Sequence, residues 1–382
     1  MIDQTSPSSS AESVRLIPLS TGRKIPVAAY GTFHSDWAQA LMKDATIEAI
    51  KSGWRHLDTA RAYQNEYVVG EAIRESIRKG YITSRNELCI TGKLWNGHMK
   101  PKDVAPALEA TLRDLGIDEI NLYLNHWPWP NVHAPGCTGD QRNPGAVPYI
   151  HEAFLETWGA ICKLKKAGKI IDIGTSNHTR ATIALLLRDV AAEERPVCNQ
   201  MELHPLFQQT ELRRYFESEG ITCTGYMAMG SPKRPSRDKF KEHKSDLDHP
   251  VIQQIARECD ISAGQVCLAW AAQREKHSGG YVVMSTNSKH IRENLVPATQ
   301  DLLSEDQMLR IDGDSTDANP GIDANNRLIW GQVFLWPEAD GNWRLLWDDS
   351  QVFLTPDGYQ KFKTSWNAHH AVQLATTSGR AK

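Results

Sequence analysis

The sequence predicts an α/β protein, a closed (β/α)₈ TIM barrel with an N-terminal β-hairpin and an extended C-terminal tail. Eight short runs are rich in β-branched or aromatic residues, and longer stretches with helical periodicity lie between them. This repeated alternation of strand and helix favours a closed parallel barrel, and a doubly wound open sheet is the alternative.

The chain divides into three predicted parts. Residues 1–13 are polar and are expected to be disordered. Residues 14–312 form the barrel domain, which begins with a hairpin around Thr21 and Gly22 that plugs one end of the core. Residues 313–382 form a C-terminal extension. The predicted strands are VAAYGTF, WRHLDTA, LCITGKL, INLYLNHW, KIIDIGTS, VCNQMEL, ITCTGYMAM and YVVMS.

Two of the predicted helices carry clear signals at their ends. The helical pattern over residues 149–168 closes at Gly168, a residue suited to a left-handed cap. A later helix opens with Ser262 and Gln265, which have the spacing of a capping box.

Composition and charge limit the classes of partner that the protein can be expected to bind. The 382 residues are 40% hydrophobic, enough for a large core, and the net charge of −3 comes without a basic cluster. We therefore expect a small-molecule partner, no nucleic acid and no membrane. The N-terminus lacks an apolar run, which predicts a soluble, cytoplasmic protein. The seven cysteines show no C-x-x-C pair, so neither a metal site nor a disulfide framework is expected.

Polar residues stand at the ends of most predicted strands. Since catalytic groups of such folds lie at the carboxyl ends of the strands, these residues should converge on one mouth. Each alone has a plainer explanation as a helix cap, a turn residue or a solvated charge. The residues are Asp58, Thr59, Lys93, His126, Ser176, Asn177, Asn199, Gln200, Glu202 and Tyr226.

Seven motifs in chain order resemble the aldo-keto reductase family. They span residues 14–312 and read LDTARAYQNE, ITGKLWN, LYLNHWP, GTSN, NQMELHP, GYMAMGS and HIRENL. The resemblance implies a catalytic tetrad of Asp58, Tyr63, Lys93 and His126. It also implies that a carbonyl is reduced by hydride from a nicotinamide cofactor.

The resemblance gives each tetrad residue a role. Tyr63 would act as the general acid and base on the carbonyl oxygen. Lys93 would favour the phenolate and so ease proton release, and Asp58 would keep Lys93 charged and in place. His126, in its neutral form, would donate a hydrogen bond to the substrate oxygen. The alternative is a buried ion pair with two polar neighbours and no catalytic role.

The cofactor implied by the resemblance is NADP(H). Ser176, Asn177 and Gln200 would bind the carboxamide, and Tyr226 would stack on the nicotinamide, although core packing is its alternative. No G-x-G-x-x-G follows a strand, so a Rossmann site is not supported. The other predicted cofactor residues are Gly31, Thr32, Asp58, Ser285, Thr286, Asn287, His290, Glu293 and Asn294.

One departure concerns the phosphate on the adenosine ribose. Met284 and His290 stand where relatives carry a lysine and an arginine that grip the 2′-phosphate. The neighbouring Lys289 and a helix N-terminus could still attract an anion. We therefore expect NADP(H) with reduced phosphate preference, and NAD(H) as the second choice.

Aromatic residues are expected to form the substrate pocket. Phe33, Trp95 and Trp127, together with His126, occupy the positions that line it in the family. They suit an apolar aldehyde or the carbon face of a sugar. The segment 128–149 is expected to be a substrate loop, and residues 231–250 either a clasp over the cofactor or a solvated loop.

The C-terminal extension is unusual for the family. It contains a predicted hairpin around Asp340 and Gly341, and its tryptophans are costly to leave in water. They would cover the substrate mouth or form a subunit contact, so both a monomer and a homodimer remain open. These tryptophans are Trp330, Trp336, Trp343 and Trp347.

The resulting functional prediction is an NAD(P)H-dependent oxidoreductase that reduces an aldehyde or ketone, of sugar or polyol type among others, to an alcohol. The alternative is a regulatory subunit that senses the nicotinamide cofactor with little turnover. A metal-dependent hydrolase is disfavoured because His126 and His204 show no metal-ligand spacing.

Overall fold

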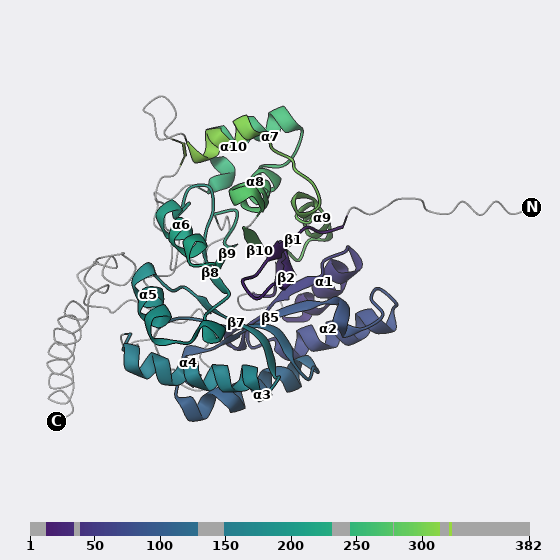
Figure 1. Ribbon diagram of the computed structural model, residues 1–382. Helices are drawn as coiled ribbons and strands as arrows, with labels where there is room; N and C mark the ends of the chain where they lie inside the picture. Colours follow the sequence, from purple (N-terminus) through teal and green to yellow (C-terminus); the bar gives the residue numbers. More distant parts are fainter. Residues whose placement is uncertain are drawn as a thin grey trace, which may run out of the picture.

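A computed structural model describes residues 13–33, 39–128, 149–230, 245–277, 279–313 and 321–322. Its centre is a closed barrel in which the strands follow the order β10-β3-β4-β5-β6-β7-β8-β9, each parallel to its neighbours (Figure 1). This confirms the predicted (β/α)₈ barrel and rules out the open sheet. The strands are β3 (Ala28–Gly31), β4 (His56–Asp58), β5 (Cys89–Leu94), β6 (Ile120–Asn125), β7 (Ile170–Ser176), β8 (Cys198–Glu202), β9 (Thr222–Tyr226) and β10 (Gly280–Val283).

The predicted hairpin is also confirmed. Strands β1 (Leu16–Pro18) and β2 (Lys24–Pro26) pair antiparallel, and Gly22 adopts a φ of 81° in the turn. The hairpin is attached to the amino-terminal ends of barrel strands: Thr222 Oγ1 donates to the Pro18 carbonyl at 3.0 Å, and Arg23 pairs with Asp172. The hairpin therefore covers the end of the barrel opposite the predicted site.

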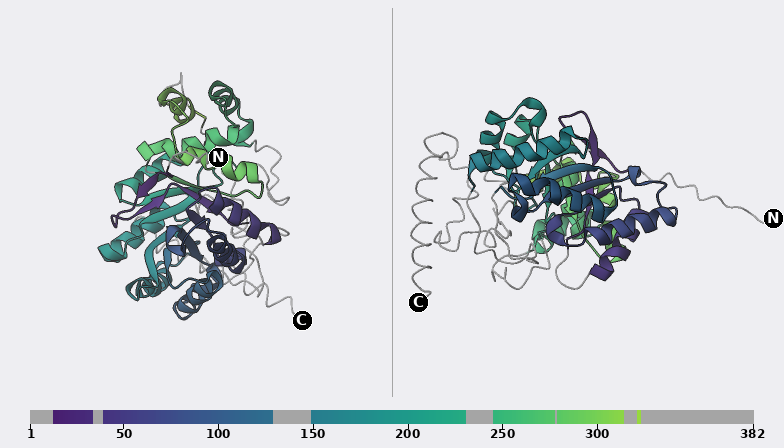
Figure 2. Two further views of the ribbon diagram at one scale, coloured as in Figure 1. Left: turned by 90° about the vertical axis from the view of Figure 1, so that its right-hand side faces the viewer. Right: turned by 90° about the horizontal axis from the view of Figure 1, so that it is seen from below.

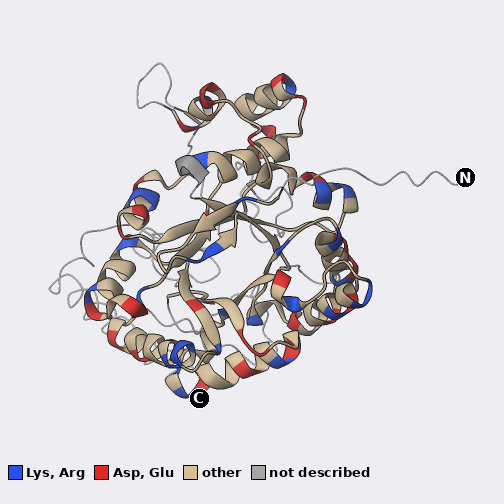
Figure 3. Cartoon of the chain, turned by 45° about the vertical axis from the view of Figure 1, so that its right-hand side comes forward, with Lys and Arg blue, Asp and Glu red and all other residues tan. Residues whose placement is uncertain are grey.

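Helices surround the strands in all views (Figure 2). Most charged residues lie on these outer helices, whereas the barrel strands carry few (Figure 3). The helices are α1 (Gln39–Lys51), α2 (Glu66–Arg78), α3 (Pro101–Leu115), α4 (His151–Lys166), α5 (Arg180–Asp189), α6 (Thr210–Ser218), α7 (Pro250–Cys259), α8 (Ala263–His277), α9 (Ser288–Glu293) and α10 (Glu305–Asp312). Short 3₁₀ turns include η1 (Arg61–Tyr63) and η6 (Asp246–Asp248).

The helix-end signals read from the sequence are confirmed. Gly168 adopts a φ of 73° just after α4. The Ser262 hydroxyl accepts from the Gln265 amide at 3.1 Å, and the Gln265 side chain accepts from the Ser262 amide, also at 3.1 Å. These reciprocal bonds satisfy N–H groups that the first turn of α8 would otherwise leave without partners.

Several predictions fall on residues outside the described ranges. They concern the polar N-terminus, most of segments 128–149 and 231–250, and the tryptophan-rich extension. Within the extension, Ile322 is described: its amide donates to the Ile311 carbonyl at 3.0 Å, and its side chain is buried in the main core. Among the described helices, none is long and apolar enough to cross a membrane.

Candidate active site

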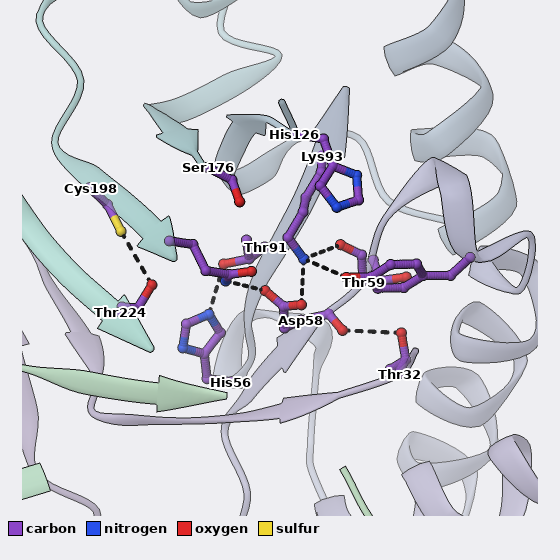
Figure 4. A network of polar contacts seen from close by, with 12 residues as sticks. Thr32, His56, Asp58, Thr59, Thr91, Lys93, His126, Ser176, Cys198 and Thr224 are labelled. Atoms are coloured by element: carbon purple, nitrogen blue, oxygen red, sulfur yellow. Dashed lines mark hydrogen bonds and ion pairs between the residues drawn. The ribbon is translucent and has the colours of Figure 1, made fainter. Parts of the chain in front are cut away.

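The four predicted catalytic residues are brought together at the carboxyl end of the barrel. Figure 4 shows Asp58, Lys93 and His126 in this group. Asp58 is the last residue of β4, Lys93 lies next to the end of β5, and His126 follows β6 directly. Tyr63 ends the short 3₁₀ turn η1 after β4. The short, buried strand β4 thus ends in a polar residue because its end opens onto the mouth of the barrel.

Lys93 is the centre of this group. Its ammonium donates to Asp58 Oδ1, to the Thr59 carbonyl at 3.1 Å and to the Tyr63 hydroxyl at 3.2 Å. Its side chain is 0% exposed and that of Asp58 is 2% exposed. A buried ammonium is tolerated only when it is paired and fully hydrogen-bonded, and here all three of its protons have acceptors.

The pKa of the Tyr63 phenol is set by two opposed effects. Burial raises the pKa of the Tyr63 phenol, and the Lys93 ammonium lowers it by a smaller amount, so the net direction is upward. The predicted influence of Lys93, which favours the phenolate, is present, and burial of the phenol acts against it. Burial lowers the pKa of Lys93, yet the pairing with Asp58 and Tyr63 outweighs it and leaves the pKa raised.

His126 is neutral at ordinary pH. Burial, together with the nearby Lys93 charge, places its pKa well below the usual value. Its ring lies 5.3 Å from Trp95, 5.9 Å from Tyr63 and 6.3 Å from Trp127, centroid to centroid. Phe33 lies 5.1 Å from the Tyr63 ring. The predicted substrate residues therefore meet around the Tyr63 phenol and form an aromatic wall.

The predicted nicotinamide residues form a second hydrogen-bonded group. Asn177 adopts a φ of 62° and donates to the His126 carbonyl at 2.9 Å and to the Ser176 hydroxyl at 3.1 Å. The Tyr226 hydroxyl donates to Asn177 Oδ1 at 2.6 Å. Asn177 thus holds Ser176 and Tyr226 in place, and the Ser176 hydroxyl keeps its own proton for another acceptor.

Gln200 makes a contact that the sequence did not indicate. Its side-chain amide donates to Asp58 Oδ2 at 2.7 Å, from a residue that is 5% exposed. Both oxygens of the Asp58 carboxylate are therefore hydrogen-bonded, one to Lys93 and one to Gln200.

Gly31 and Thr32 are placed next to Asp58. The amide and hydroxyl of Thr32 both donate to the Asp58 carbonyl, at 2.9 and 3.0 Å. A side chain at Gly31 would lie 3.1 Å from Val282 Cγ1, so this glycine permits close packing of β3 against β10. The sequence-based expectation was that Gly31 lets the backbone approach the cofactor. The contact with Val282 gives a second reason for a glycine at this position.

The predicted adenosine residues lie around the short helix α9, which has six residues. The Asn287 side chain caps this helix and accepts from the amides of Lys289 at 2.9 Å and His290 at 3.3 Å. The Lys289 ammonium lies 3.6 Å from Glu293. Two amides that an anion would use are thus already bonded, and the expected attraction of phosphate to this helix terminus is not supported.

The other residues predicted to bind the adenosine end of the cofactor differ in their burial and contacts. Ser285 Oγ accepts from the Asn287 amide at 3.1 Å, and Thr286 is exposed. The Asn294 carbonyl accepts from the Tyr281 hydroxyl at 2.7 Å. Met284 is partly buried against the core, so it offers this end of the site no charge.

A buried charged cluster beyond β8 was missed. His204 Nδ1 lies 2.9 Å from Asp246 Oδ2, and its Nε2 lies 3.2 Å from Glu202 Oε1. These carboxylates raise the pKa of His204 to about 9 in spite of its burial. The motif NQMELHP contains Glu202 and His204, but Asp246 is 42 residues further on and gave no signal. Among the described residues, no group of His, Cys, Asp and Glu could hold a metal ion.

A buried acid–lysine–phenol group at the carboxyl end of a barrel lies where barrel enzymes carry their active sites, and its chemistry allows proton transfer. Comparison with known proteins gives the family. Residues 28–314 match the model of the Aldo/keto reductase family. The chain belongs to this family, as the motifs predicted.

Individual relatives agree. An aldo/keto reductase of Synechocystis is 35% identical over 88% of this chain and 97% of its own length. Aldo-keto reductase family 1 member A1 of Xenopus tropicalis is 39% identical over 69% of this chain and 79% of its own length. An aldo-keto reductase of Bombyx mori, solved in complex with NADP, superposes with a TM-score of 0.69 at 30% identity, covering 83% of this chain and 95% of the other.

Proposed function

We propose that this protein reduces an aldehyde or ketone to an alcohol with NADP(H), and that Tyr63 delivers the proton. The observation that carries the proposal is the hydrogen-bonded series Asp58–Lys93–Tyr63 beside the neutral His126. This series needs no metal ion, and it places a phenol at the mouth of the barrel among aromatic side chains.

The raised pKa of Tyr63 suits this role. A phenol that stays protonated at neutral pH is ready to donate to an oxygen on which negative charge develops. Lys93 stabilises the phenolate left behind, since its ammonium already donates to the Tyr63 hydroxyl. His126 can donate a hydrogen bond to the same oxygen because its neutral ring keeps one N–H, and its buried Nδ1 has no partner among the described residues.

The donor and acceptor set of the second group fits a nicotinamide. Among the described residues the Ser176 hydroxyl proton has no acceptor, and the Tyr226 ring is held by its bond to Asn177. A carboxamide needs such a polar partner, and a flat ring needs an aromatic face. When bound, the cofactor supplies the hydride. The relative of Bombyx mori was solved with NADP, which supports the same cofactor here.

The preference for the phosphorylated cofactor is proposed to be weak, with NAD(H) also accepted. Met284 brings no cation, His290 stands at the second expected position, and the Lys289 charge lies near Glu293. A hydrogen bond to a charged group contributes roughly 1.5 to 3 kcal/mol, so two missing contacts weaken discrimination about a hundredfold or more. A ratio of NADPH to NADH efficiency above about a thousand would contradict this.

The aromatic wall is suited to bind carbonyl compounds with an apolar portion, or sugars that present a carbon face to Trp95 and Trp127. The test is a panel of aldehydes, ketones and sugars assayed with NADPH and NADH. Turnover that disappears in Tyr63→Phe supports the proposal. Negligible turnover across the panel, together with a stoichiometric partner protein, would instead favour the sensing role.

A further inference from the structure

Asp58 is held from two sides of the barrel. Lys93 reaches it from the adjacent strand β5 and donates to Oδ1, and Gln200 donates to Oδ2 from β8 at 2.7 Å. In the closed strand order, β4 and β8 lie opposite each other. The bond between Gln200 and Asp58 therefore crosses the interior of the barrel and joins residues that are 142 positions apart.

We propose that Gln200 is a positioning residue that fixes the Asp58 carboxylate, and through it the Lys93 ammonium, against the Tyr63 phenol. The proposal rests on the proposed carbonyl reduction and adds a role to the carboxamide contact that the family resemblance gives this glutamine.

The bond to Lys93 alone would not fix the orientation of the Asp58 carboxylate. A carboxylate rotates about its terminal torsion, and Lys93 sits at the end of a flexible side chain. A bond to each oxygen fixes the plane of the carboxylate. Since Asp58 and Gln200 are 2% and 5% exposed, water has little access to replace a lost donor.

The other titratable groups near Asp58 are already engaged. The titratable groups facing Asp58 are Lys93, Tyr63, His56 and Cys198. His56 is bonded elsewhere: its Nε2 lies 2.8 Å from Thr91 Oγ1, and its Nδ1 lies 3.3 Å from the Pro26 carbonyl. Cys198 Sγ lies 3.6 Å from Thr224 Oγ1.

The amide chemistry allows both roles at once. A glutamine side chain has two N–H donors and one carbonyl acceptor. One donor is used by Asp58, which leaves the carbonyl oxygen and a second N–H for a ligand carboxamide. Gln200 would thus connect the carboxamide position directly with the ion pair.

The first experiment compares Gln200→Leu and Gln200→Glu with a control, Ser176→Ala. Ser176 belongs to the same proposed carboxamide site, and the hydrogen bonds of the described residues join its hydroxyl to Asn177 and not to Asp58. The readouts are kcat at saturating NADPH, the NADPH dissociation constant and the pH profile of kcat. Gln200→Leu should lower kcat on the order of tenfold, as expected for a lost bond to a charged group.

The pH profile separates positioning from cofactor binding. A hydrogen bond to a carboxylate favours its charged form, so Gln200→Leu should move the acidic limb of kcat to higher pH. Gln200→Glu should move it further, because two adjacent carboxylates share a proton. Ser176→Ala should weaken NADPH binding with no such shift. If both Gln200 variants weaken NADPH binding and leave the limb in place, the proposal is wrong.

A double-mutant cycle tests the contact without any turnover. Urea unfolding is measured for Gln200→Leu, Asp58→Asn and the double variant. The double variant should lose less unfolding free energy than the two single variants lose together. The difference should correspond to about a tenfold factor in the unfolding equilibrium constant. Additive losses would overturn the inference. If the wild type reduces no carbonyl compound, the proposed function fails, and the cycle still decides the role of Gln200.

Discussion

The His204 cluster makes stability depend on pH in a direction that the structure fixes. His204 and Asp246 are both 0% exposed, and Glu202 completes the group from β8. The two carboxylates raise the pKa of His204 from 6.5 to about 9. His204 therefore holds its proton more tightly in the folded chain than in the unfolded chain.

The magnitude follows from the shift. A pKa difference of one unit corresponds to about 1.4 kcal/mol, so the pairing contributes on the order of 3 kcal/mol to the free energy of unfolding. Because the pKa is raised in the folded state, this contribution is complete below about pH 6.5. It is lost as the pH rises through the folded value of about 9.

The assay is urea unfolding at a series of pH values between neutral and strongly alkaline. Lysine, tyrosine and cysteine groups also titrate there, so the wild type is compared with a control that combines His204→Gln and Asp246→Asn. The difference between the two proteins should decrease by on the order of 3 kcal/mol across this range. A difference that does not change with pH would refute the assignment of His204 as a cation.

Two further predictions concern the site itself. Lys93→Met should destabilise the fold by about 3 to 5 kcal/mol in urea unfolding, because it leaves the buried Asp58 carboxylate without its cation; a loss under about 1 kcal/mol, typical of an exposed pair, would contradict the buried pairing. Met284→Lys combined with His290→Arg should raise the ratio of NADPH to NADH efficiency about a hundredfold or more, since each change adds a charged partner for the phosphate; an unchanged ratio would show that these positions do not face it.

Periodicity and turn residues were sufficient to predict the fold. Strand and helix patterns are local properties of the sequence, and the hairpin around Gly22 and the cap at Gly168 depend on single residues with positive φ. The grouping of the four predicted tetrad residues at one end of the barrel was predictable too, because the carboxyl ends of barrel strands meet at one mouth. Asp58 and Lys93 end neighbouring strands and are therefore close in any such barrel.

The missed features depend on distances across the fold. The sequence shows that Lys93 can approach Tyr63, but the net pKa of the phenol depends on burial, which only the packed barrel determines. Gln200 reaches Asp58 because β4 and β8 lie opposite each other, and no local pattern reports that pairing. Asn287 similarly caps the helix whose terminus was expected to attract phosphate.

The central claim is that the Tyr63 hydroxyl, beside Lys93, delivers the proton to a carbonyl oxygen. The most direct test is Tyr63→Phe, which keeps the aromatic ring and removes the hydroxyl. We predict that kcat on an accepted carbonyl substrate falls by about two to four orders of magnitude, the usual contribution of a positioned acid or base, while NADPH affinity changes little. A variant that keeps wild-type kcat would contradict the account.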